Sequence, residues 1–118
     1  MNDINLIRED TESIRLRFKR DGVEAVPNGL AEGDIFILTL RNRRDEVTLT
    51  KTITYPEQTF YLSSNDTAKL INSPYRYDIE YNKPNPDYDG TNEQYLITKT
   101  FVIGNVNVYQ DVTRRTPW

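Results

Sequence analysis

The sequence predicts an all-β protein folded as a β-sandwich, and three features of its 118 residues support this fold class. Apolar and polar residues alternate in several short runs, which is the period of a half-buried strand. Gly, Pro, Asn and Asp cluster between these runs at the spacing of sandwich turns. No run predicts a long helix.

Two strands are predicted in the N-terminal part of the chain. Asn5–Arg8 forms a weak first strand. In the second, over residues 14–19, apolar side chains alternate with Arg and Lys; the apolar ones are Ile14, Leu16 and Phe18. The section 21–34 contains three glycines and a proline, and therefore predicts a long surface connection.

Two longer strands follow this connection. Ile35–Arg41 begins apolar on both faces, as a central strand of a sandwich should. A polar turn leads into Glu46–Tyr55, where an apolar row shares one face and four threonines share the other. Pro56 ends this strand, because proline cannot donate to a strand ladder.

The segment 59–81 predicts a short strand, a helical turn and a strand rich in tyrosine. Phe60 and Leu62 belong to the short strand. Several N-cap residues at 63–66 precede a single helical turn near residues 66–71. The next strand has large side chains at every second position on one face: Tyr75, Tyr77, Ile79 and Tyr81.

The last part of the chain predicts a turn-rich loop and two strands. The loop covers 82–91, and a long strand follows over Glu93–Ile103. One apolar row is expected on that strand, formed by Tyr95, Ile97, Phe101 and Ile103. Gly104 and Asn105 then break the strand, and Val106–Val112 adds a short final one.

Two lysines interrupt apolar rows. Lys51 lies in the row of the Glu46–Tyr55 strand, and Lys99 lies in the row of the last long strand. Each is interpreted as a snorkelling stem, a sheet edge or a bulge. The alternative is a charged pair across the sheet with Asp78 or Glu80.

Composition excludes several kinds of chemistry. The chain has no Cys and no His, which excludes disulfides, Cys-based and His-based metal sites and the usual Ser–His or Cys–His nucleophiles. A net charge of −3 and a pI near 5.0 argue against nucleic-acid binding. No run resembles a signal peptide or a membrane span, so we expect no membrane insertion and folding in the cytoplasm. No cofactor is expected.

An acidic loop resembles the first half of a calcium-binding loop. Asn85, Asp87 and Asp89 place oxygen ligands at alternate positions before Gly90. The bidentate Glu expected at the twelfth position is replaced by Leu96. We interpret the segment as a hairpin loop that uses Asp-Gly as a turn, with a weak calcium site as the alternative.

Two groups of Arg residues are candidates for contacts with other molecules. Arg41, Arg43 and Arg44 lie close to two acidic residues, which predicts a solvated hairpin tip. The C-terminal tail, residues 114–118, combines Arg side chains with the only Trp, and both residue types are enriched in interface hot spots. The candidate interface residues are Arg114, Arg115, Trp118, Tyr88 and Tyr109.

Tyrosines and carboxylates suggest two further functions. Surface tyrosines could stack on sugars, although tyrosines alternating in strands more often pack in a core or an interface. A carboxylate pair could hydrolyse a glycosidic bond. Nothing in the sequence pairs two carboxylates across a cleft, so a carbohydrate-binding or adhesive module is the stronger of these two alternatives.

With the strands in order, the chain resembles a known family. The motifs are GDIFILTLRNRRDE, FYL, NDTAKL, SPYRYDIEY and YLITKTFVIGNVNVYQDVT, spanning about 34–113. They are similar to the immunoglobulin-like N-terminal domain of baseplate upper proteins of tailed phages that infect Gram-positive hosts. Members usually continue into a coiled-coil or receptor-binding region, whereas this sequence stops at Trp118.

The strand pattern predicts seven to eight strands without a domain boundary, so we expect one antiparallel β-sandwich domain over residues 1–113 and a tail over 114–118. The resemblance implies that this sandwich is immunoglobulin-like. It also implies a non-enzymatic structural protein of a phage or prophage tail, located in the virion after assembly in the host cytoplasm. The expected partners are other tail or baseplate proteins, or further copies of this chain.

Overall fold

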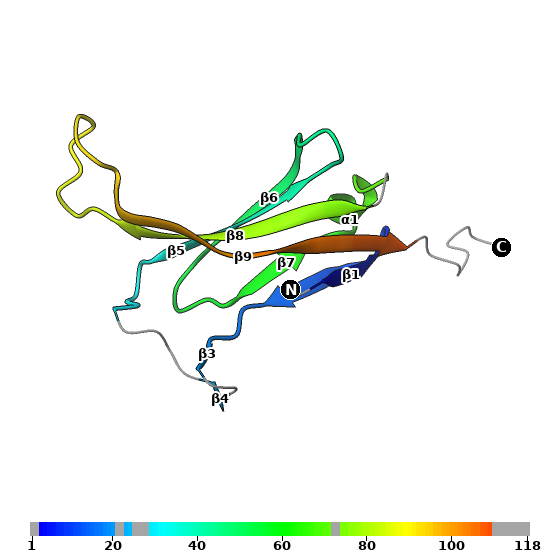
Figure 1. Cartoon of the computed structure of the whole chain (residues 1–118), viewed down its shortest axis with the longest axis horizontal. Coiled ribbons are helices and arrows are strands. Elements are labelled where there is room, and N and C mark those ends of the chain that lie inside the picture. Colours follow the sequence, from blue (N-terminus) through cyan, green and yellow to red (C-terminus); the bar gives the residue numbers. More distant parts are fainter. Residues whose placement is uncertain (1–2, 21–22, 25–28, 72–73, 110–118) are drawn as a thin grey trace.

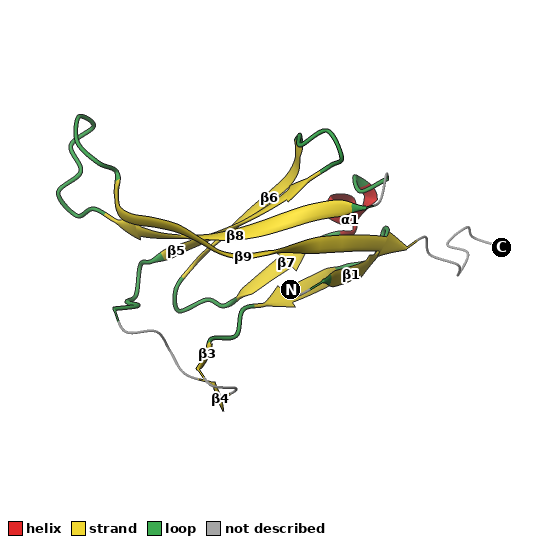
Figure 2. Cartoon of the chain, viewed as in Figure 1, coloured by secondary structure: helices red, strands yellow, loops and turns green. Residues whose placement is uncertain are grey.

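A computed structural model describes residues 3–20, 23–24, 29–71 and 74–109 of the chain. Strands dominate this part, with one short helix (Figures 1 and 2). The strands are β1 (Ile4–Ile7), β2 (Glu12–Arg15), β3 (Lys19–Arg20), β4 (Val23–Glu24), β5 (Ile35–Arg41), β6 (Val47–Thr54), β7 (Thr59–Leu62), β8 (Tyr75–Pro84) and β9 (Tyr95–Tyr109). The helix α1 (Ser64–Ala68) lies between β7 and β8.

The strands form a large sheet and a small one that faces it. The large sheet has the order β1-β9-β8-β5-β6, and the small sheet pairs β2 with β7. β1 runs parallel to β9, while every other strand pairing in the described part is antiparallel. The prediction of an all-β, sandwich-like fold is therefore confirmed. The second predicted strand, over 14–19, is divided: β2 ends at Arg15, and Lys19 belongs to β3, which pairs with β4 inside the section 21–34 that was predicted as a connection.

The core lies between the two sheets. Alternate residues of β5 point inward, where they meet Phe60 and Leu62 of β7. Fully burying a side chain of this size contributes roughly 1.5–3 kcal/mol, so this layer supplies most of the stability. The most deeply buried apolar side chains are Phe36, Leu38, Leu40, Phe60, Leu62, Leu70 and Val106.

The tyrosine-rich strand has the predicted alternation. Tyr75, Tyr77 and Ile79 are buried, and Tyr81 is half-buried and stacks at a tilt on Phe36. These tyrosines are core residues. They do not form a platform on the surface.

The long strand β9 differs from the prediction in two ways. It continues through Gly104, which is buried opposite Tyr77. The predicted apolar row is also wrong, because Ile97 is 45% exposed and Ile103 is 63% exposed. A bulge explains the outward direction of Ile103: Ile79 pairs with Val102 but Glu80 pairs with Thr100, so one extra residue of β9 inverts the alternation. Ile97 lies beyond the bulge, opposite Lys83, and is exposed because the described core includes no residue of β9 before Val102. Of the other two residues in the predicted row, Tyr95 is half-buried, and the side chain of Phe101 lies outside the described residues.

The helix begins earlier than predicted. Ser63 is its N-cap, and Ser63 Oγ accepts a hydrogen bond from the backbone N–H of Asp66 at 3.1 Å. In return, Asp66 Oδ2 accepts one from the backbone N–H of Ser63 at 2.8 Å. This reciprocal capping box fixes the start of the helix before the predicted residues 66–71. The five-residue helix is the only one in the described part, where no helix is long enough to cross a membrane.

Candidate functional site

The structure separates the predicted interface residues. Tyr88 belongs to the loop between β8 and β9, and Tyr109 ends β9, so they lie at opposite ends of the molecule (Figure 1). Both side chains are exposed. Arg114, Arg115 and Trp118 lie outside the described residues.

Tyr109 belongs to an exposed apolar stripe on the outer face of the large sheet. Ile7, Ile103 and Tyr109 form this β1–β9 stripe, and they are 41%, 63% and 57% exposed. Ile7 lies beside Tyr109 in the parallel pairing, and Ile103 points the same way because it is an even number of residues away. The neighbouring Leu6 and Val106 point into the core and are buried.

Polar groups lie both within and around the β1–β9 stripe. Asn107 donates a side-chain hydrogen bond to Asn5 Oδ1 at 3.2 Å across the same face. On β8, Arg76 forms an exposed ion pair with Asp45 at 2.8 Å. Burial raises the pKa of the Asp78 carboxyl, and the cation of Arg41 opposes this effect. Asn105 and Asn107 lie on the same face of β9 between Ile103 and Tyr109, so this surface mixes apolar and polar side chains, as protein-interaction surfaces commonly do.

The acidic loop is the hairpin connection between β8 and β9, as interpreted. Its side-chain oxygens already hold the loop together: Asn85 Oδ1 accepts a bond from the Asp87 N–H at 3.0 Å. Asp89 Oδ1 accepts bonds from the Thr91 hydroxyl at 2.6 Å and the Thr91 N–H at 2.8 Å. These bonds hold the pKa of the Asp89 carboxyl below its usual value, and the bond from the Thr91 hydroxyl is the largest cause.

No group of three or more His, Cys, Asp or Glu in the described ranges is placed to hold a metal ion. Calcium binding by Asn85, Asp87 and Asp89 stays a prediction.

The basic cluster lies at the tip of the β5–β6 hairpin, as predicted. Arg41 Nη1 donates to the backbone carbonyl of Asp45 at 3.2 Å. Asn42 Oδ1 accepts bonds from the backbone N–H groups of Arg44 and Glu46 at 2.9 and 3.0 Å. The cluster is therefore a closed turn mixed with acidic residues.

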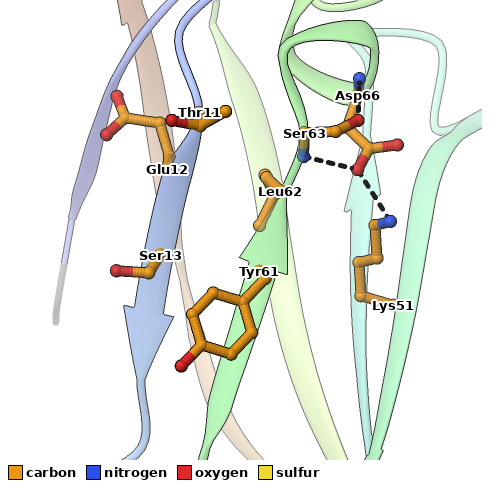
Figure 3. Close-up of a pocket in the computed structure, with 8 residues that line it drawn as sticks. All are labelled: Thr11, Glu12, Ser13, Lys51, Tyr61, Leu62, Ser63 and Asp66. Carbon is orange, nitrogen blue, oxygen red and sulfur yellow. Dashed lines mark hydrogen bonds and ion pairs between the residues drawn. The ribbon is translucent and has the colours of Figure 1, made fainter.

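A second candidate surface is an open groove of about 630 Å³ beside α1 (Figure 3). Elements β2, β6, β7 and α1 contribute to it. Its lining residues are Thr11, Glu12, Ser13, Lys51, Tyr61, Leu62, Ser63 and Asp66.

Lys51 forms one wall of this groove. It lies on the edge strand β6, in agreement with the sheet-edge interpretation, and its Nζ is 2.7 Å from Asp66 Oδ2. The alternative pairing with Asp78 or Glu80 is therefore wrong for Lys51. The ammonium group of Lys51 is the largest cause that holds the pKa of Asp66 below its usual value.

Three hydroxyl groups in the groove have no intramolecular partner among the described residues: those of Thr11, Ser13 and Tyr61. Ser13 and Tyr61 lie directly opposite each other on β2 and β7. Tyr61 is 73% exposed, and Figure 3 shows its ring between Ser13 and Lys51. Tyr61 was not among the candidate site residues predicted from the sequence. Its position between Phe60 and Leu62, which point into the core, already indicated that its side chain points outward.

A buried polar cluster lies where β5 begins. Asp34 Oδ2 accepts a bond from the Tyr81 hydroxyl at 2.6 Å and one from the Ala31 N–H at 3.0 Å. Lys83 Nζ lies 3.1 Å from both carboxylate oxygens and also donates to the carbonyl of Gly29. Burial acts to raise the pKa of Asp34, but these donors outweigh it and the pKa is lowered. Burial and Asp34 together raise the pKa of Tyr81 to about 12. All of these groups are satisfied by one another, so we assign the cluster a structural role.

Comparison with protein-family models, with curated proteins and with solved structures gives no match for this chain.

Proposed function

We propose that this chain is a non-enzymatic structural protein of a phage or prophage tail or baseplate, and that the β1–β9 stripe docks it onto a neighbouring subunit. The proposal combines the sequence resemblance with one observation. Ile7, Ile103 and Tyr109 lie exposed on one face of a sheet whose other face forms the core. Ile7 and Tyr109 are direct neighbours, with Ile103 farther along β9, and exposed apolar patches with polar surroundings often mark protein-interaction sites.

The size of the stripe indicates the strength of docking. Fully burying one such side chain contributes roughly 1.5–3 kcal/mol, and these three are about half-exposed beforehand, so each adds about 1 kcal/mol. Association costs at least roughly 4 kcal/mol in lost freedom of motion. The three side chains together contribute about 3 kcal/mol, which does not offset this cost, so the stripe of one copy alone does not give stable docking. When several linked copies bind to one particle, a copy that dissociates rebinds at a high effective concentration, so the copies together stay firmly attached.

The partner in this proposal is another tail or baseplate protein, and the site of action is the virion. Co-expression of the chain with the products of its flanking genes tests this directly. We expect it to co-purify with the particle or subassembly that they form, where several copies dock together, and we expect Ile103→Asp to abolish co-purification because it places a charge within the proposed interface.

Val47→Asp is the matched control, because Val47 is also a β-branched, exposed side chain but lies on the opposite edge strand. It should co-purify like the wild type. The proposal fails if no flanking gene product binds, or if both variants bind as well as the wild type.

A further inference from the structure

Tyr61 gives the groove beside α1 an aromatic surface. The ring lies on the outer side of β7, while its neighbours Phe60 and Leu62 are buried on the other side. The strand holds the tyrosine in place, and a tyrosine has only two side-chain torsions to lose when it contacts a ligand. The negatively polarised face of an aromatic ring attracts the polarised C–H groups on the face of a sugar ring.

The groups around Tyr61 suit a ligand rich in hydroxyls. The hydroxyls of Thr11 and Ser13 are exposed and are without partners within the described part of the chain. Each can donate one hydrogen bond and accept two. Glu12 accepts one bond, through Oε2, from the backbone N–H of Ile7 at 2.8 Å. Glu12 is opposite Leu62 on the other face of β2, so its carboxylate points away from the Tyr61 ring (Figure 3).

The charges in the groove argue against an anionic ligand. Its two carboxylates, Glu12 and Asp66, outnumber its single cation, Lys51. Lys51 is already paired with Asp66 at 2.7 Å. An apolar ligand is also disfavoured, because the aliphatic member of the lining, Leu62, is 1% exposed and offers almost no surface.

The geometry points to a binding site for a short neutral oligosaccharide, with Tyr61 stacked on one sugar ring and the hydroxyls of Thr11 and Ser13 bonded to its hydroxyls. The volume of about 630 Å³ lies within the range of ligand sites, roughly 300–1,000 Å³. The groove is open, so a glycan chain can continue past it in either direction. This function is independent of the proposed assembly role, because the groove and the β1–β9 stripe share no residue.

NMR titration of the full chain, labelled with ¹⁵N, tests the site. The probes are cellotriose, maltotriose and tri-N-acetylchitotriose, with a sulfated heparin tetrasaccharide for comparison. We expect at least one neutral probe to shift the amide signals of Ser13, Tyr61 and Ser63 while the signal of Ile103 stays fixed. The site is refuted if all three neutral probes leave the spectrum unchanged, or if the sulfated probe binds most tightly.

Tyrosine variants test the stacking role. Tyr61→Ala should raise the dissociation constant about tenfold, which corresponds to roughly 1.4 kcal/mol. Tyr88→Ala is the matched control, since Tyr88 is an exposed tyrosine on a distant loop, and it should bind like the wild type. Ser13→Ala is a second test that leaves the ring in place and should weaken binding less. Equal affinity of Tyr61→Ala and the wild type would overturn the assignment.

Discussion

Asp34 shows how single residues stabilise this domain. Its carboxylate is 3% exposed, and such a buried charge is tolerated only because several donors surround it. The Tyr81 hydroxyl, the Ala31 N–H and Lys83 Nζ all contact it within 3.1 Å. Together they join the start of β5 to β8, which are neighbours in the large sheet.

The lowered pKa of Asp34 makes a prediction about acid stability. Its ordinary value is 3.8, and the folded value lies below that. The stabilisation is therefore fully present above the ordinary value and is lost as the pH falls through the lower, folded value. Urea unfolding at a series of pH values should show a larger loss of unfolding free energy for the wild type than for Asp34→Asn. A steeper loss in the variant would contradict this assignment.

Lys51 shows what the sequence predicts and what it leaves open at this scale. Its place in an apolar row was interpreted as a snorkelling stem, a sheet edge or a bulge, and the structure places it on the edge strand β6. Its partner depends on which element covers that edge, and periodicity along one strand carries no such information. The partner is Asp66 of α1, reached through the turn after β7.

At the scale of elements, short interactions set boundaries that propensity alone does not. The helix α1 has five residues, too few to be stable alone. Its position is fixed by the capping box between Ser63 and Asp66 and by the burial of Thr67 and Leu70. The Thr67 hydroxyl also donates to the carbonyl of Asp10 at 2.7 Å, which ties α1 to the turn before β2.

Removing the cap should weaken the whole domain. We expect Ser63→Ala to lower the free energy of unfolding by about 1 kcal/mol, because the Asp66 N–H loses its acceptor. Chemical denaturation measures this change. Ser64→Ala, one residue later and outside the box, should leave stability within about 0.5 kcal/mol of the wild type. Equal effects of the two substitutions would argue against the cap.

The positions of the strands could mostly be predicted from the sequence. Which side chains of a strand point into the core could be predicted only where the strand has no bulge. The alternation of Tyr75, Tyr77 and Ile79 placed β8 correctly, since its inner face is regular. The same reasoning failed on β9, where one extra residue between Thr100 and Val102 turns Ile103 outward. A bulge depends on pairing with the neighbouring strand, so it leaves little trace in the sequence of one strand.

At the scale of the whole molecule, the two faces of the large sheet differ. The inner face is covered by β2 and β7, while no element in the described part covers the outer face of β1 and β9. The β1–β9 stripe lies on that uncovered face. The groove lies on the other side of the molecule, beside β7 and α1 (Figure 3). Neither surface could be found from sequence alone, because each combines strands that are distant along the chain.

The contact between the two sheets can be tested by substitution of adjacent residues on β7. Phe60 is fully buried, and Phe60→Ala should cost about 3–5 kcal/mol of unfolding free energy. Domains of this size have only about 5–15 kcal/mol in total, so the thermal midpoint should fall sharply. Tyr61→Ala, on the opposite face, should change stability by less than about 0.5 kcal/mol. Similar losses for both variants would mean that β7 does not pack as described.

The central claim is that the β1–β9 stripe is covered in an assembled particle. Photo-crosslinking tests it most directly, with a benzophenone amino acid placed at position 103 or, as the control, at position 47 in cells that produce the particle. We predict a crosslink from position 103 to a neighbouring tail subunit and none from position 47. A crosslink from position 47 alone, or none from position 103, would contradict the claim.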